Sequence, residues 1–586
     1  NTAVGYQALT DNTTGGLNAA LGREALFKNT EGNQNTACGT YTLYENLTGI
    51  ENTAVGYVAL EKNTASYNTA VGSRALDLNT TGASNVALGY QALTSNTTAD
   101  NNTAIGYGAM AANSTGADNT AVGSGALDAN TTGSYNTAVG CRALTAFSGS
   151  GSCAVGEDAL MTATSGTQNI AMGQSALRLL STGNYNIAIG ANTLAASATF
   201  SSNTAVGQAA LNANESNNNS AFGFNALLTN TTGTQNNAFG GYALDANTTG
   251  SQSNAFGYLS LSNNNASYNN AFGQQTLEDN TTGTHNCAFG HDSLRENTTA
   301  SHNTAVGSQS LSVVTTSGSN AAFGYQALKS LTTGGNNTGL GHKAFEDLTT
   351  GSHCVAVGHD CAKNATTGGS TTAIGVDCLA SLTTGGGNTA LGRLCGSDVT
   401  DGYDNVFLGQ QAGRGQGNVN RNLYIARDNT GSSSVSTWIY GDQFGRCYMG
   451  SNDASWHTTS DQRLKKDIVD NTKGLEIINQ VKVRNFKYKQ YTDGSPVSSD
   501  DTVDINEFPK ADNLNQVLIQ QGVTGVKLGC IAQELETVLP NAVKTGDKGV
   551  KTVVTDELFW HMVNAVKELS AKNDALEARL AALEGS

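Results

Sequence analysis

The hydrophobic residues of this chain recur in short clusters with a fixed period, and polar turn residues separate the clusters. The segment Asn1-Thr2-Ala3-Val4-Gly5-Tyr6-Gln7-Ala8-Leu9 occurs in 25 copies, and its glycine returns from Gly5 to Gly409 every 17 or occasionally 16 residues. Such a period indicates stacked identical units, and one unit is too short for a helical repeat. Each copy predicts a strand at Thr-Ala-Val, a bend at glycine and a short second strand around Ala-Leu. An Asn-Thr-Thr-Gly turn, in which Asn and Gly supply left-handed and positive-φ conformations, then completes one coil of a β-solenoid.

Both faces of the predicted strand are small or apolar. Side chains alternate across a strand, so the central Ala points one way while Thr and Val point the other. One face lines the coil, whereas the other needs a partner, because so short a coil encloses very little core. We therefore expect residues 1–412 to form a homotrimeric parallel β-solenoid shaft, a β-roll of about 25 coils. A self-contained triangular β-helix is the alternative, although only two apolar clusters recur per coil.

Individual slots of the repeat predict ladders of like side chains. Five consecutive coils carry Phe in the Val slot, which predicts an aromatic ladder from Phe222 to Phe289. The abundant Asn and Thr are expected to form turns and to hydrogen-bond from coil to coil. Glycosylation of Asn-Thr-Thr and ice binding by threonine rows are weaker alternatives. The calcium-binding signature Gly-Gly-x-Gly-x-Asp is absent from the sequence.

The pattern changes after the last glycine of the series, and we expect the period to end at Gly409. Short aromatic-rich runs in residues 413–455 predict a β-rich cap that becomes the distal tip if the tail is removed. Residues 456–556 have ordinary globular composition, and residues 557–586 carry a heptad seam. This seam predicts a trimeric coiled coil, in which Asn573, Leu569 and Leu576 set the register, and a packed surface helix is the alternative. The seam residues are Met562, Val566, Leu569, Asn573, Leu576, Leu580 and Leu583.

Composition and charge exclude several classes of protein. The chain has 69 glycines but only 3 prolines, which argues against collagen, and 13% charged residues, which argues against a disordered polyelectrolyte. The net charge is −16 without a basic stripe, so we expect no nucleic-acid partner. No run approaches the roughly 18 apolar residues that span a bilayer, so membrane insertion is not expected. No secretory signal precedes Asn1, but the chain starts within a repeat, so we expect an upstream region to be missing.

The ten cysteines are expected to be free thiols rather than disulfides or metal ligands. No Cys-x-x-Cys pair occurs, and the spacings do not resemble a zinc module, so we expect no metal and no cofactor. Cys361, Cys378 and Cys395 occupy the same slot of consecutive copies and would stack on successive coils. Stacked strands lie about 4.8 Å apart, but parallel in-register side chains rarely reach the torsion that a disulfide requires.

Three sequence segments near the C-terminus stand out from the repeat. They are His457-Thr458-Thr459-Ser460-Asp461-Gln462-Arg463-Leu464-Lys465-Lys466-Asp467-Ile468, then Gly529-Cys530-Ile531-Ala532-Gln533-Glu534-Leu535-Glu536, and then Leu539-Pro540-Asn541-Ala542-Val543. In this order they resemble the intramolecular chaperone found at the C-termini of endosialidase tail spikes and other phage fibres. The resemblance covers about residues 456–586 and implies an α+β chaperone domain before the coiled coil.

The resemblance also implies a single-turnover serine autoprotease that needs no metal. Ser460 would attack the carbonyl that precedes it and break the Thr459–Ser460 bond, with Lys465 as the base and with Asp461 and Arg463 in supporting roles. A neutral lysine serves as a base if burial lowers its pKa. Alternatively, Ser460-Asp461 is only a helix-start signal.

The repeat itself is similar to the Asn-Ser-Val-Ala-Ile-Gly repeat in the heads of trimeric autotransporter adhesins, although the coil lengths differ. Together the two resemblances predict a viral tail fibre located on the virion and assembled in the host cytoplasm. Its expected partners are two further copies of the chain, an upstream virion attachment protein, and a host receptor that is a glycan or a surface protein. The alternatives are a bacterial trimeric surface adhesin and an ice- or glycan-binding β-solenoid. A glycan-degrading spike is disfavoured, because no acidic pair stands out from the repeat.

Overall fold

The computed structural model describes residues 1–427, 437–445, 447–449, 474–486, 491–492, 495–496, 527–529, 531–545, 551–553 and 555–585 of the 586-residue chain. The chain divides into two compact units, Asn1–Trp438 and Ile439–Ser586, and each is described by itself.

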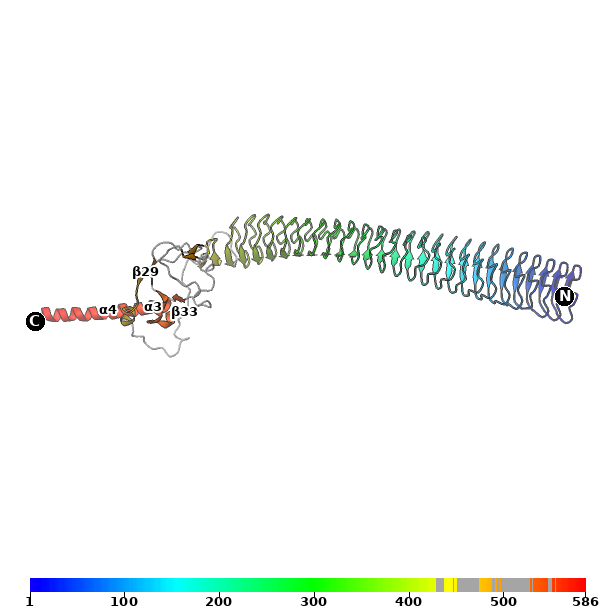
Figure 1. Cartoon of the computed structure of the whole chain (residues 1–586), viewed down its shortest axis with the longest axis horizontal. Helices are drawn as coiled ribbons and strands as arrows, with labels where there is room; N and C mark the ends of the chain where they lie inside the picture. Colours follow the sequence, from blue (N-terminus) through cyan, green and yellow to red (C-terminus); the bar gives the residue numbers. More distant parts are fainter. Residues whose placement is uncertain are drawn as a thin grey trace. The chain divides into compact units, whose positions relative to one another are not determined.

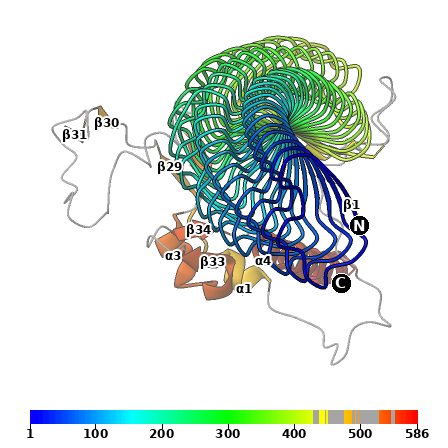
Figure 2. The same ribbon diagram turned by 90° about the vertical axis from the view of Figure 1, so that its right-hand side faces the viewer.

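The first unit is a parallel β-solenoid in which each turn contributes one three-residue strand (Figure 1). The strands pair in register, so that Ala221 lies opposite Ala238 and Phe222 opposite Phe239. Successive turns rotate steadily in one direction, as the end-on view of Figure 2 shows. Because a single strand forms per turn, the triangular β-helix, which needs three, does not form in the described residues.

The strands of the shaft are β1 Thr2–Val4, β2 Ala19–Leu21, β3 Thr36–Cys38, β4 Thr53–Val55, β5 Thr69–Val71, β6 Val86–Leu88, β7 Thr103–Ile105, β8 Thr120–Val122, β9 Thr137–Val139, β10 Cys153–Val155, β11 Ile170–Met172, β12 Ile187–Ile189, β13 Thr204–Val206, β14 Ser220–Phe222, β15 Asn237–Phe239, β16 Asn254–Phe256, β17 Asn270–Phe272, β18 Cys287–Phe289, β19 Thr304–Val306, β20 Ala321–Phe323, β21 Thr338–Leu340, β22 Val355–Val357, β23 Thr372–Ile374, β24 Thr389–Leu391 and β25 Val406–Leu408.

The parallel ladder continues one strand beyond the glycine series. Strand β26, Leu423–Ala426, pairs in parallel with β25, and Val406 lies opposite Leu423. The expectation that the period ends at Gly409 is therefore wrong by one turn. The repeat spacing persists from Val406 to Leu423, but Ala426 stands where the next glycine would fall. Beyond it, β27, Thr437–Gly441, pairs with β28, Cys447–Met449, in an antiparallel manner.

Two buried ladders of asparagine hold successive turns together. In the ladder that precedes the strands, the Asn52 amide N–H donates to Asn35 Oδ1 at 2.9 Å, and Asn52 Nδ2 donates to the Ala65 carbonyl at 2.9 Å. In the turn ladder, Asn46 Nδ2 donates to Asn29 Oδ1 at 2.9 Å and to the Gly49 carbonyl at 3.0 Å. These side chains are fully buried, and their hydrogen bonds remove the cost of burying amides. The predicted coil-to-coil ladders are confirmed.

The expected second strand around Ala-Leu does not form. Glu24 and Leu26 have φ of 56° and 51°, so alternate residues of this segment are left-handed, and a strand cannot accommodate that alternation. The segment nevertheless bonds to the next turn, since the Leu26 amide donates to the Thr42 carbonyl at 3.0 Å. Leu26 is fully buried, so core packing offsets the strain of its backbone.

The glycine of the Asn-Thr-Thr-Gly turn also differs from the expectation. Gly32 has no positive φ, whereas the glycine after each strand has one, as at Gly39 with φ 138°. A Cβ at position 32 would approach the carbonyl oxygen of Gly49 on the next turn closely, so close approach, rather than handedness, favours glycine here. The preference is not absolute, since Ala99 and Ala300 occupy the equivalent position of other turns.

The second unit contains short strands, short helices and one long helix. The helices are α1 Leu475–Ile478, α3 Ala532–Glu536, the 3-10 helix η3 Pro540–Ala542, and α4 Thr555–Glu584. The strands form antiparallel pairs: β29 Arg484–Phe486 with β32 Lys527–Gly529, β30 Tyr491–Thr492 with β31 Ser495–Pro496, and β33 Val543–Thr545 with β34 Lys551–Val553. Within the described part of the chain, no helix is both long and apolar enough to span a bilayer.

Candidate functional site

An unpartnered apolar column runs along the outside of the shaft. It consists of the third residue of every strand from β1 to β25, which is Val, Leu, Ile, Met, Phe or, once, Cys. From β2 onward the central residue of the strand, usually alanine, faces the interior and is buried, whereas the column residues stay half-buried or exposed. Val4, Leu88 and Leu391, for example, are 56%, 46% and 50% exposed. We call this feature the outer apolar column, and it shows that the second strand face is not covered within one chain.

The phenylalanines of the column stack along five consecutive turns. Ring centroids lie 4.6 Å apart from Phe222 to Phe239 and 4.5 Å apart from Phe272 to Phe289, with nearly parallel planes. The predicted aromatic ladder is confirmed. Beside it on the same strand face, Asn254 Nδ2 donates to Asn270 Oδ1 at 2.6 Å. The ladder gives these turns an outer surface unlike that of the valine-bearing turns.

Helix α4 uses two different faces. Leu558, His561 and Ala565 lie toward the rest of the second unit, and His561 and Ala565 are buried. The heptad residues lie on another face and are exposed, with Leu569 at 58% and Leu576 at 62%. Sequence reasoning identified the heptad face but missed the packed face, whose spacing of three and then four residues was its signal.

Asn573 lies exposed in the middle of the heptad face. Its Nδ2 donates to Glu577 Oε1 at 3.1 Å within the same helix. Register setting by Asn573, Leu569 and Leu576 concerns contacts between chains, and it stays a prediction.

The apolar residues of the resemblance motifs form the core of the second unit. Leu535, Leu539 and Ala542 are buried and form a cluster against which neighbouring apolar side chains pack. The packed side chains are Ile477, Val481, Val538, Val543, Val553 and Leu558. The motif residues thus join α1, α3, η3, the β33–β34 pair and α4 into one body.

Two polar contacts that the sequence did not reveal reinforce this body. Glu568 on α4 accepts hydrogen bonds from the amides of Gly474 at 2.7 Å and Leu475 at 3.2 Å, and so caps the start of α1. Arg484 forms a two-bond ion pair with Glu534, with Nη2 2.7 Å from Oε1. The hydrogen bond from Arg484 lowers the pKa of Glu534 below its usual range.

The residues assigned to self-cleavage lie outside the described residues. They are Thr459, Ser460, Asp461, Arg463 and Lys465. Their roles therefore stay predictions that rest on the sequence.

The cysteines of the described residues are free thiols. Cys361, Cys378 and Cys395 stack on successive turns, and each Sγ donates to a carbonyl of the next strand, such as Cys361 to Ala373 at 3.2 Å. Hydrogen bonding to the neighbouring thiols, together with burial, raises the pKa of Cys378 far above its ordinary value. These thiols are small core residues rather than nucleophiles.

Comparison with known proteins identifies the C-terminal segment. Residues 460–544 match the family described as the chaperone of endosialidase, and the match contains α1, α3 and η3 but not α4. No curated protein and no solved structure matches the chain. The chain therefore carries an endosialidase-type chaperone domain after a β-solenoid shaft of about 25 turns, the combination that fits a tail-fibre-like protein.

Proposed function

We propose that three copies of this chain assemble into a homotrimeric viral tail fibre that attaches to a host surface. The chaperone domain aligns the chains and then detaches by cutting the Thr459–Ser460 bond. The observation that carries this proposal is the outer apolar column, which runs without interruption over 25 strands. Soluble monomers rarely leave apolar patches larger than a few hundred Å² exposed. When three chains pack together, their outer apolar columns cover one another. The exposed heptad face of α4 also favours three chains per fibre.

The chaperone is needed because the shaft specifies its register weakly. Neighbouring turns share the same column chemistry, so three chains could pair one turn out of step at little local cost. A trimer formed first at the C-terminus sets the alignment, and the turns then pair from that end. Once many turns have paired, each slip must break many contacts together, so the mature shaft is kinetically stable without the chaperone.

Self-cleavage follows from the chemistry of Ser460. Its Oγ attacks the Thr459 carbonyl carbon while neutral Lys465 accepts the hydroxyl proton. The peptide bond breaks as that proton passes to the Ser460 nitrogen, which leaves an ester between Thr459 and Ser460 Oγ. Water then hydrolyses the ester, so that Thr459 ends in a carboxylate and Ser460 carries a free amine. The start of the family match at Ser460 supports this position.

Host attachment is supported by aromatic side chains that project from the shaft. Tyr6, Tyr107, Tyr135 and Tyr185 are 66%, 64%, 71% and 62% exposed. Tyrosine combines a large apolar ring with a hydroxyl and is frequent at binding interfaces. The receptor is a glycan or a surface protein, and a virion attachment protein joins the fibre to the virion, which assembles in the host cytoplasm.

The proposal is tested by native mass measurement of the expressed chain. The wild type is expected to give a trimer of residues 1–459 and a released piece of residues 460–586. Ser460→Ala and Lys465→Ala are expected to trimerise without releasing this piece, whereas the neighbouring Lys466→Ala cleaves normally. A stable monomer would refute the assembly, and cleavage by Ser460→Ala at the same bond would refute the assigned nucleophile.

A further inference from the structure

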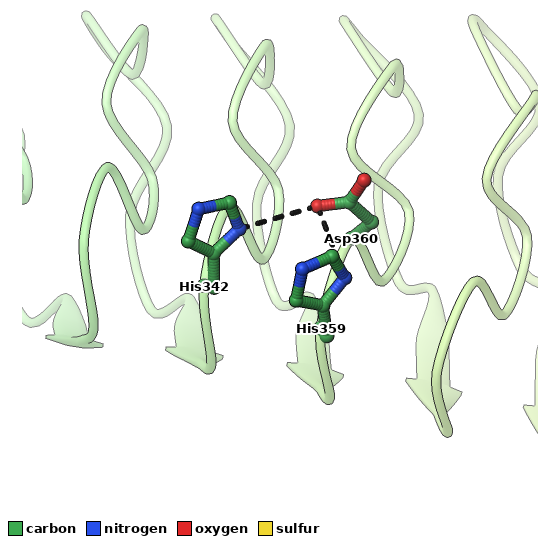
Figure 3. Close-up of side chains that lie close together, drawn as sticks. All are labelled: His342, His359 and Asp360. Atoms are coloured by element: carbon green, nitrogen blue, oxygen red, sulfur yellow. Dashed lines mark hydrogen bonds and ion pairs between the residues drawn. The ribbon is translucent and has the colours of Figure 1, made fainter.

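Two histidines and one aspartate from successive turns converge on the surface of the shaft (Figure 3). His342 follows β21, whereas His359 and Asp360 follow β22. One potential ligand atom of each residue lies within 4.8 Å of the others. Both imidazoles are exposed, and the Asp360 side chain is only 15% exposed. In the described part of the chain, this is the one group of three His, Cys, Asp or Glu residues with such proximity.

The two separations between the carboxylate and the imidazoles suit a metal ion better than they suit hydrogen bonds. Asp360 Oδ1 lies 3.4 Å from Nδ1 of His342 and 3.4 Å from Nδ1 of His359. Hydrogen bonds from N–H to oxygen are normally about 2.7–3.2 Å long, so both contacts are stretched. Ligands at about 2.05 Å from a tetrahedral zinc ion lie roughly 3.3 Å from one another. Both carboxylate–imidazole distances match this separation between two ligands of one zinc ion.

The solenoid holds the three side chains in place. The His342 and His359 rings stack with centroids 4.6 Å apart, and Tyr325 stacks on His342. The Asp360 amide donates to the His342 carbonyl at 2.9 Å, which ties the two turns together directly beneath the cluster. Nδ1 of both stacked imidazoles lies on the side of Asp360 Oδ1, at the same distance from it.

Lys363 shares the carboxylate but leaves one oxygen for an ion. Its Nζ lies 2.8 Å from Asp360 Oδ2, the oxygen that does not face the imidazoles. This contact fixes the orientation of the carboxylate. Lys363 also interacts with Asp377 and Glu346, so acidic neighbours compensate its charge.

Other histidines of the shaft show what the cluster adds. His291 lies 3.1 Å from Asp292, but Ser308 occupies the equivalent place on the next turn. His285 and His302 stack 5.2 Å apart with no carboxylate in their group. The combination of two imidazoles and a carboxylate is therefore a property of this turn pair and not of the repeat.

We infer that His342, His359 and Asp360 bind one zinc-class divalent cation per chain, with water as the fourth ligand, and that the ion clamps two successive turns together. Two imidazoles with one carboxylate form a donor set that zinc prefers, and an open fourth position is common at exposed sites. The inference departs from the expectation of a chain without metal. Its sequence signal was a pair of histidines in the same slot of consecutive copies, with aspartate directly after the second.

The experiment titrates Co²⁺ into the metal-free full chain, expressed without a histidine tag, and records the visible absorption of tetrahedral Co²⁺. Wild type is expected to bind one equivalent per chain, and Zn²⁺ is expected to displace it. His359→Ala and Asp360→Asn are expected to weaken binding by more than about 10-fold, which is already the cost of losing an outer-shell partner. The matched control His285→Ala/His302→Ala retains wild-type binding.

The outcomes separate the site from adventitious binding. Absence of the tetrahedral spectrum in wild type would overturn the inference, as would unchanged binding in both His359→Ala and Asp360→Asn. An equal loss of Co²⁺ binding in the His285→Ala/His302→Ala control would also overturn the inference, because binding would then depend only on the number of histidines. Circular dichroism of each variant verifies that the solenoid is intact.

Discussion

Two adjacent glycines on one turn are expected to respond in opposite ways to the same substitution. Gly240 has φ 142°, and a Cβ there would collide with the carbonyl oxygen of Gly257 on the next turn. Gly241 has no positive φ, and the nearest atom to its Cβ is a ring carbon of Tyr258 at 3.5 Å, an ordinary contact. Gly240→Ala and Gly241→Ala thus form a matched pair that differs only in the backbone environment.

The penalty for Gly240→Ala is expected to be about 3–5 kcal/mol. Backbone strain in this glycine-only region costs about 1–3 kcal/mol. Relief of the collision separates two turns and weakens two flanking hydrogen bonds, which are worth about 1 kcal/mol each. These bonds run from the Gly240 amide to Phe222 and from the Gly257 amide to Phe239, both at 2.8 Å. Gly241→Ala is expected to change stability by about 0.5 kcal/mol or less.

Amide hydrogen exchange followed by mass spectrometry measures both effects, because turns open locally. Each 1.4 kcal/mol corresponds to about a tenfold change in the opening constant, so peptides from β15 and β16 should exchange at least about 100-fold faster in Gly240→Ala. The same peptides of Gly241→Ala should exchange within about threefold of the wild type. The close-approach explanation for Gly240 would be refuted if Gly240→Ala exchanged its amide hydrogens at the wild-type rate. It would also be refuted if exchange were accelerated equally in both variants.

Three further predictions concern the helix seam, one carboxyl group and the thiols. Leu576→Asp on the heptad face is expected to abolish C-terminal trimers, as measured by light scattering. Substitution of its exposed neighbour, Ala575→Asp, is expected to leave the trimers intact, and trimers in both variants would show that the heptad face is not the trimer contact. Burial raises the pKa of Asp245 to about 6, so the folded state binds this proton more tightly than the unfolded state. The free energy of unfolding should therefore fall as the pH rises from about 4 to 6. The thermal midpoint of Asp245→Asn should exceed that of the wild type at pH 7 but not at pH 4. The same difference in midpoint at both pH values would contradict the raised pKa. Iodoacetamide should modify exposed Cys141 in the native protein and spare buried Cys378 until unfolding, and equal labelling would contradict the stacked arrangement.

The sequence alone was sufficient to predict the stacked architecture, since a fixed period repeated 25 times allows few other folds. It also predicted the phenylalanine and asparagine ladders, because in-register stacking places like residues directly above one another. The chaperone domain followed from motifs whose apolar residues, such as Leu535 and Leu539, were later found in its core.

The tertiary structure decided the features that depend on distances between turns. Alternating backbone handedness replaced the expected strand at Leu26, because spacing in the sequence carries no record of the sign of φ. Gly32 proved to be a close-approach residue, which is visible only when the Gly49 carbonyl is in place. The His342–His359–Asp360 cluster became apparent only when successive turns were stacked. Local patterns specify which residues repeat, whereas the stacking distance between turns specifies which of their atoms meet.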